Sequence, residues 1–130
     1  MQMLITISGV VSIAISVFLF GFQLALGLGA PLGEFAWGGK NKVLPASQRN
    51  FCIGMGILHL LGAFFVAVRA GFLPLPILEM VIAVFMWMFV LLAFLNTLGN
   101  AFSQNRKERA LMLPLSILSF AVNLLVALFA

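Results

Sequence analysis

The sequence contains no aspartate and no tyrosine, and it has a single cysteine, Cys52, and a single histidine, His59. One cysteine excludes a disulfide framework within the chain, and one cysteine with one histidine excludes a Cys/His zinc cluster. The lack of aspartate also excludes an Asp-containing catalytic triad. We therefore expect neither a metal site nor a bound cofactor, and no catalytic residue can be assigned.

Charged residues are scarce as well. They make up 8% of the chain, whereas 64% of the residues are hydrophobic. Soluble domains average about 25% charged and about 45–50% apolar residues. The mean hydropathy of +1.23 agrees with this imbalance. A soluble domain of 130 residues could not bury so much apolar surface, so the composition predicts an integral membrane protein.

Four apolar segments are long enough to cross a bilayer, which requires about 20 residues in a helix. Polar and apolar residues do not alternate within them, so membrane strands are excluded and helices remain. We expect an all-α fold, a four-helix integral membrane bundle of two antiparallel transmembrane hairpins in a single domain, 1–130. The first segment has no basic residue before it and is too long for a signal peptide, so we expect it to be retained. The predicted spans are residues 4–28, 51–68, 77–98 and 110–129.

Basic residues gather on one side of these spans. Loops 29–50 and 99–109 hold three each, whereas the opposite face holds only Arg69. The positive-inside rule therefore places both loops in the cytoplasm and both termini outside the inner membrane. The expected partners are the bilayer and its anionic lipid heads, with no nucleic acid, because the basic residues form no continuous stripe. The six loop cations are Lys40, Lys42, Arg49, Arg106, Lys107 and Arg109.

The first loop, 29–50, is rich in glycine and proline, which makes a regular helix throughout improbable. Its GEFAWGGK stretch fails the P-loop pattern, because the glycine spacing is wrong and Asn41 follows the lysine. Two interpretations remain. The loop is a compact interfacial cap, with Glu34 paired to Arg49 or to a cation of loop 99–109, or it forms a site for a lipid head group or small anion. The candidate contacts are Glu34, Trp37, Lys40, Lys42, Arg49, Arg106, Glu108 and Arg109.

His59 lies near the middle of the second predicted span. An ionisable residue at that depth is costly and is a functional candidate by default. The favoured interpretation is a packing histidine, hydrogen-bonded to a serine of the first span or to a backbone carbonyl. The alternatives are proton relay or ligand contact, for which the titration range of histidine is suited, and haem ligation across a dimer.

Two further features point first to structure. Arg69 and Glu79 flank the short outer turn, so opposite charges at matching depth are expected to pair, with gating of an outer cavity as the alternative.

Ser8, Ser12 and Ser16 recur every four residues, a spacing that lets helices approach closely in lipid. We expect this face to pack within the bundle, with a homo-oligomer seam as the alternative.

The two basic loops also carry a recognisable pattern. The first loop contains the elements GAPxGE, WGG, LP and R, and the second contains RxER followed by P. In this pattern the chain resembles a widespread group of small bacterial four-helix integral membrane proteins with no assigned reaction. The resemblance implies a bacterial inner-membrane location and a four-span fold. It rests on Gly29, Ala30, Pro31, Gly33, Glu34, Gly38, Gly39, Leu44, Pro45 and Arg49, then on Arg106, Glu108, Arg109 and Pro114.

Three classes of function fit these observations. The favoured one is a non-enzymatic membrane protein that binds lipid or a partner membrane protein through its basic cytoplasmic loops. The second is an oligomeric transporter or channel, in which His59, Gln23 and Asn123 would face one cavity. The third is a membrane enzyme acting on a lipid or quinone, which would need acid–base groups within hydrogen-bond reach of its substrate.

Overall fold

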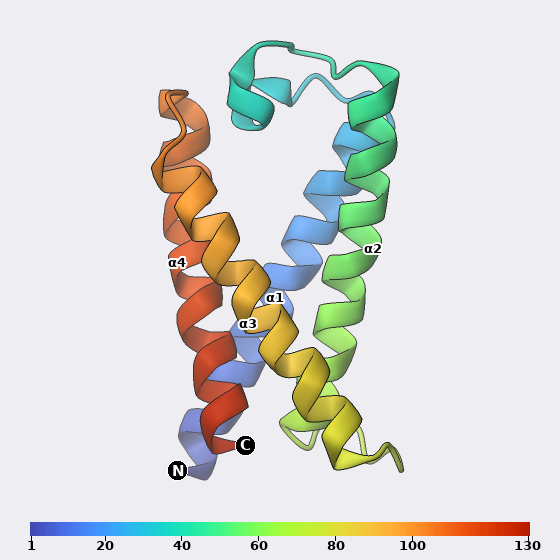
Figure 1. Cartoon of the computed structure of the whole chain (residues 1–130), viewed down its shortest axis with the longest axis vertical. Coiled ribbons are helices and arrows are strands. Elements are labelled where there is room, and N and C mark those ends of the chain that lie inside the picture. The colour runs from blue at the N-terminus through green and yellow to red at the C-terminus, as the bar shows by residue number, and fades with distance from the viewer.

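The structure, a computed structural model, describes residues 1–130 and is entirely helical (Figure 1). Two short 3-10 helices, η1 (Gly33–Phe35) and η2 (Trp37–Gly39), lie in the first loop. The four long helices are α1 (Gln2–Gly27), α2 (Ala46–Arg69), α3 (Glu79–Ala101) and α4 (Arg106–Phe129).

All four long helices have the length and apolar composition needed to cross a membrane. A membrane-spanning helix pairs its backbone groups internally, which is why such apolar segments fold this way in lipid. The expected all-α four-helix bundle is therefore confirmed. Both termini lie at one end of the bundle, and the first loop lies at the other (Figure 1).

The helices extend beyond the apolar spans at the loop side. α2 begins at Ala46, directly after Pro45, so Arg49 lies in its first turns rather than in a loop. α4 begins at Arg106, because the side chain of Asn105 accepts a hydrogen bond from the backbone N–H of Lys107. The second cluster of basic residues is thus held on a helix and not in an irregular connection.

A glycine allows α1 and α2 to pack closely at the cap end of the first hairpin. A Cβ added at Gly27 would lie 2.4 Å from Cγ1 of Ile53 and 3.1 Å from the backbone oxygen of Arg49. Small residues at such contacts bring helix backbones together in a bilayer, where packing rather than apolar burial drives association.

The serine face of α1 packs inside the bundle, as expected. Ser8, Ser12 and Ser16 are all buried. The hydroxyl of Ser12 donates to the side-chain oxygen of Asn123 on α4, which ties the first hairpin to the second. An interhelical hydrogen bond of this kind satisfies polar groups that lipid could not.

The main apolar core occupies the half of the bundle nearer the termini. The ring of Phe65 on α2 stacks on Phe85 of α3, with centroids 4.4 Å apart and planes 7° apart. Met86 and Val126 are completely buried in the same cluster. Toward the first loop the two hairpins diverge, and residues 28–45, here called the cap, lie across that end (Figure 1). This arrangement places the candidate site beneath the cap.

Candidate ligand cavity beneath the cap

The cap is a folded segment rather than an open loop. The backbone N–H of Gly33 donates to the carbonyl of Lys42 at 2.8 Å, so the segment closes on itself. Trp37 has a φ of 52°, and Gly38 and Gly39 follow with φ of 75° and 73°. A positive φ is uncommon for a residue with a side chain, whereas glycine accepts it freely. Leu44 is buried and anchors the returning segment of the cap against α1 and α2.

Polar contacts hold the cap to the start of α4. Nζ of Lys107 lies 2.8 Å from Oε2 of Glu34, which is the single ion pair in the structure. The backbone N–H of Gly38 donates to Oε2 of Glu108 at 3.0 Å, and the side-chain amide of Asn105 donates to the carbonyl of Glu34. The cap therefore joins the two hairpins. Glu34 was expected to pair with Arg49 or with a cation of loop 99–109, and the structure shows the second of these pairings, with Lys107.

Arg49 serves the first hairpin instead of Glu34. Its Nε donates to the carbonyl of Gly27 at 3.2 Å, at the last residue of α1. The final carbonyls of a helix lack partners within the helix, and a cation there also interacts favourably with the helix dipole. Arg49 thus stabilises the end of α1 from which the cap departs.

The remaining basic candidates lie on the outside. Arg109 donates to the carbonyl of Ser103 at 3.0 Å. The side chains of Lys40, Lys42 and Arg106 are exposed and form no hydrogen bond or ion pair within the chain. These cations are therefore free to face lipid heads or water at the rim of the cap.

A cavity of about 480 Å³ lies under the cap, between the hairpins. This volume is within the range of about 300–1,000 Å³ that is typical of small-molecule sites. All four helices and the cap contribute to its walls. Its aromatic residues are Phe22, Phe35, Trp37 and Phe51. Its polar residues are Gln23, His59, Asn96, Asn100, Glu108 and Ser116.

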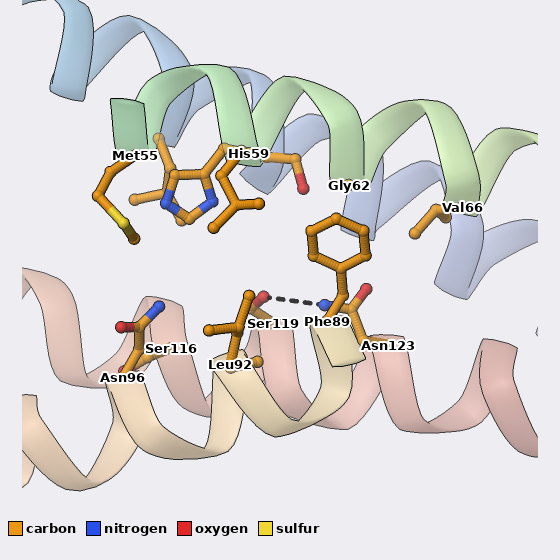
Figure 2. A pocket seen from close by; sticks show the side chains of 14 residues that line it. Met55, His59, Gly62, Val66, Phe89, Leu92, Asn96, Ser116, Ser119 and Asn123 are labelled. Atoms are coloured by element: carbon orange, nitrogen blue, oxygen red, sulfur yellow. Dashed lines mark hydrogen bonds between the residues drawn. The ribbon is translucent and has the colours of Figure 1, made fainter. Parts of the chain in front are cut away.

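A smaller recess of about 40 Å³ continues from this cavity into the membrane-spanning region. His59, Asn96 and Ser116 line both spaces, so they mark the junction. Figure 2 shows His59 directed from α2 into the space between the hairpins, with Asn96 directed toward the same space from α3. Asn123 lies further along the recess, where its amide donates to Ser119 at 3.4 Å (Figure 2).

Some polar groups of the cavity wall have partners in the protein and others do not. The side-chain amide of Asn100 donates to Ser116 at 3.2 Å, and Ser116 in turn donates to the carbonyl of Met112 at 2.7 Å. The side chains of His59, Asn96 and Gln23 form no hydrogen bond within the chain, although all three line the cavity. All three are half-buried, so these side chains are available to a ligand or to water.

The favoured interpretation of His59 is therefore wrong. We expected a bond to a serine of the first span or to a backbone carbonyl, and the structure forms neither. The physical reason is the divergence of the hairpins: α2 presents His59 to an open space, and Ser16 of α1, which lines the recess together with His59, forms no hydrogen bond to it. The alternative of ligand contact remains as a proposal.

The expected ion pair between Arg69 and Glu79 is also not formed. Arg69 donates instead to the carbonyl of Ala127 at 2.9 Å, near the end of α4. Glu79 is exposed at the first turn of α3. Each charge is placed favourably by a helix dipole, the cation at a C-terminal end and the anion at an N-terminal end. Neither residue lies near the cavity beneath the cap.

Ser116 and Ser119, which line the recess, were not among the candidates expected from the sequence. Their signal was present as spacing: Ser116, Ser119 and Asn123 lie three and four residues apart, on one face of a helix. Polar residues on one face of an apolar helix usually point to the bundle interior or to a cavity.

No protein-family model, no curated protein and no solved structure matches this chain.

The Glu34 contact predicts an acid-sensitive cap. The hydrogen bond from Lys107, together with its positive charge, lowers the pKa of the Glu34 carboxyl. Because the pKa of Glu34 is lowered in the folded protein, the Glu34–Lys107 contact stabilises the cap fully above the ordinary pKa of about 4.3. This stabilisation is lost as the pH falls through the lowered pKa of Glu34. We therefore expect the emission of Trp37 to change in acid, measured in a Trp87→Phe background where Trp37 is the single tryptophan.

Glu34→Gln is the control for this titration, because an amide keeps the shape and cannot change its charge. Glu108 also holds the cap, through Gly38. The loss or shift of the transition in Glu34→Gln would support the assignment. An identical transition in both proteins would contradict it.

Proposed function

We propose that this chain is a small integral membrane protein that binds a lipid-soluble small molecule in the cavity between its two hairpins, beneath the cap. The observation that carries the proposal is a cavity of about 480 Å³ whose walls combine apolar and aromatic side chains with unpartnered polar groups. Binding sites for small molecules have this composition, with a few polar groups that fix orientation on an apolar wall.

Binding explains the arrangement better than transport does. The cavity reaches the middle of the bundle from the cap end, and the core cluster around Phe65, Met86 and Val126 fills the other half. A transport path would have to cross that packed cluster. Catalysis is less favoured, because the wall offers one carboxylate, Glu108, and it already accepts hydrogen bonds from Gly38 and Ser103.

The basic residues fit a supporting role at the membrane surface. Lys40, Lys42 and Arg106 are exposed around the cap and would contact anionic lipid heads. The positive-inside rule then orients the cap toward the cytoplasm, with both termini on the opposite face. In this orientation the cavity opens in the cytoplasmic half of a bacterial inner membrane, where the diverging hairpins give a lipid-soluble ligand access from the bilayer.

A pair of glycines on the helices tests the proposal. Gly99 lines the cavity, and a Cβ added there would meet nothing within 4 Å, so leucine at this position extends into free space. Gly54 is also helical with open space around it, and it does not line the cavity. Gly99→Leu should reduce ligand occupancy about tenfold or more, because overfilling a site costs about 1–3 kcal/mol. Gly54→Leu should leave occupancy unchanged.

Native mass spectrometry of gently solubilised protein gives both results, since it reports subunit number and retained small molecules together. We expect the wild type and Gly54→Leu to carry one defined adduct that Gly99→Leu lacks. The same adduct on all three proteins, or random lipids alone on the wild type, would contradict binding in this cavity.

A further inference from the structure

We infer that the ligand carries a neutral carbonyl or hydroxyl head, which sits against His59 and Asn96 at the deep end of the cavity. This inference rests on the proposed function and narrows it to a class of ligand. It is carried by two independent observations: the distribution of charge around the cavity, and the position of the polar groups that have no partner in the protein.

Charge comes first. The wall of the cavity includes one charged side chain, Glu108, and no cation. The phosphate of an ordinary lipid would therefore enter a space with no group to neutralise it, at a large desolvation cost. All of the basic side chains in loops 29–50 and 99–109 lie outside the wall. The cavity is thus unsuited to an anionic head, even though the surrounding surface is basic.

A cationic head is disfavoured for a different reason. Glu108 is already engaged, because Oε2 accepts hydrogen bonds from Gly38 at 3.0 Å and from the hydroxyl of Ser103 at 2.9 Å. It also lies in the first turn of α4, where the helix dipole stabilises a negative charge, and Lys107 and Arg109 are its chain neighbours. Its charge is therefore compensated without a ligand.

Two of the three unpartnered polar side chains identify where the head sits, because they line both the cavity and its recess, whereas Gln23 lines the cavity alone. A neutral histidine offers one donor and one acceptor, and an asparagine amide offers both kinds of group. His59 and Asn96 present these groups from α2 and α3 to one space, at the junction of the cavity and its recess (Figure 2). A carbonyl accepts from such a pair, and a hydroxyl both donates and accepts.

The rest of the cavity fits the remainder of such a molecule. From His59 toward the cap, the wall includes the apolar side chains of Phe22, Leu95 and Leu115, alongside the polar side chains of Gln23, Asn100 and Glu108. A ring or the first part of an acyl or prenyl chain fits beside these residues. The recess beyond, of about 40 Å³, has room for a water molecule or two and not for a further chain, so the head enters first.

The test uses Trp37, which lines the cavity, as the reporter. In the Trp87→Phe protein in detergent, decylubiquinone serves as a neutral carbonyl probe that quenches tryptophan. Three competitors then displace it: dioctanoylglycerol with a hydroxyl head, dioctanoyl phosphatidic acid with an anionic head, and tetraphenylphosphonium as a cation. We expect dioctanoylglycerol to displace decylubiquinone at much lower concentrations than either charged competitor.

Variants of the two polar residues test the position of the head. His59→Leu and Asn96→Leu should each weaken decylubiquinone binding about five- to tenfold, the loss of one net hydrogen bond. His59→Gln keeps a donor and an acceptor and should bind nearly as the wild type does. Thr97→Val is the matched control, because Thr97 lies beside Asn96, bonds to its own helix at Ala93 and does not line the cavity.

The outcomes separate the two proposals. If decylubiquinone binds equally to all of these variants, the placement of the head is wrong, while the cavity itself still binds. If phosphatidic acid or tetraphenylphosphonium competes better than dioctanoylglycerol, the neutral head is wrong. If decylubiquinone quenches no more than it does in a Trp37→Phe protein, the proposed binding function itself is contradicted for this ligand class.

Discussion

Gly33→Ala is expected to open the cap. A Cβ at this position would lie 1.8 Å from the carbonyl oxygen of Asn41 and 2.8 Å from that of Lys42. Both atoms belong to the backbone, so no side-chain rotation relieves the clash, and the segment has to separate. Overpacking costs about 1–3 kcal/mol, and a clash with backbone belongs at the upper end of that range. The loss falls on the cap alone, because the helices are held by their own packing.

Limited trypsin digestion measures this effect, since Lys40 and Lys42 lie within the cap. Cleavage tracks the population of the opened segment when reclosing is fast, so a cost of about 2.7 kcal/mol raises the rate about a hundredfold. Gly54→Ala is the control, because a Cβ there meets open space. Equal digestion rates for Gly33→Ala and the wild type would show that the cap is not closed as described.

Phe65→Ala is expected to cause the largest loss of stability in the membrane-spanning region. The ring of Phe65 is buried, stacks on Phe85 with centroids 4.4 Å apart and lies 6.4 Å from the ring of Phe89, so it packs α2 directly against α3. Removing a buried phenyl ring costs about 3–5 kcal/mol in soluble proteins. Lipid also solvates apolar groups, so the transfer part is missing, and we expect about 2 kcal/mol from lost packing.

The free energy of unfolding in mixed detergent micelles provides the measurement. Phe18→Ala is the matched control, because that ring is about half exposed, at 48%, and its only aromatic neighbour lies on the same helix. The control should lose less than about 0.5 kcal/mol, as surface substitutions usually do. Equal losses for the two variants would contradict a core centred on Phe65.

The membrane architecture was predictable from sequence because each span carries its own signal. Length and apolar composition identify a helix that crosses lipid, whatever its neighbours are. The intramolecular serine face was predictable for a similar reason, since its spacing lies within one helix. The cap–α4 contact was predictable in part, because opposite charges in two loops on one face have few other partners.

The cavity was not predictable, because it depends on the angle between the hairpins. No local sequence pattern indicates that α2 and α3 diverge toward the cap, and this divergence leaves the side chain of His59 without a partner. The error at Arg69 has a related origin. Glu79 was expected to pair with Arg69 because the two residues lie at matching depth in one hairpin. The actual acceptor, the carbonyl of Ala127, belongs to a helix that is distant in sequence.

Photo-crosslinking in cell membranes tests the central claim most directly. Leu115 lines the cavity, whereas Leu118 on the same helix does not and is 46% exposed. A benzophenone amino acid at position 115 therefore reacts inside the cavity, and one at position 118 reacts at the outer surface. We expect one defined small molecule with a neutral head on the protein labelled at position 115, and a mixture of membrane phospholipids on the protein labelled at position 118. The same phospholipid mixture at both positions would show that the cavity holds no specific ligand.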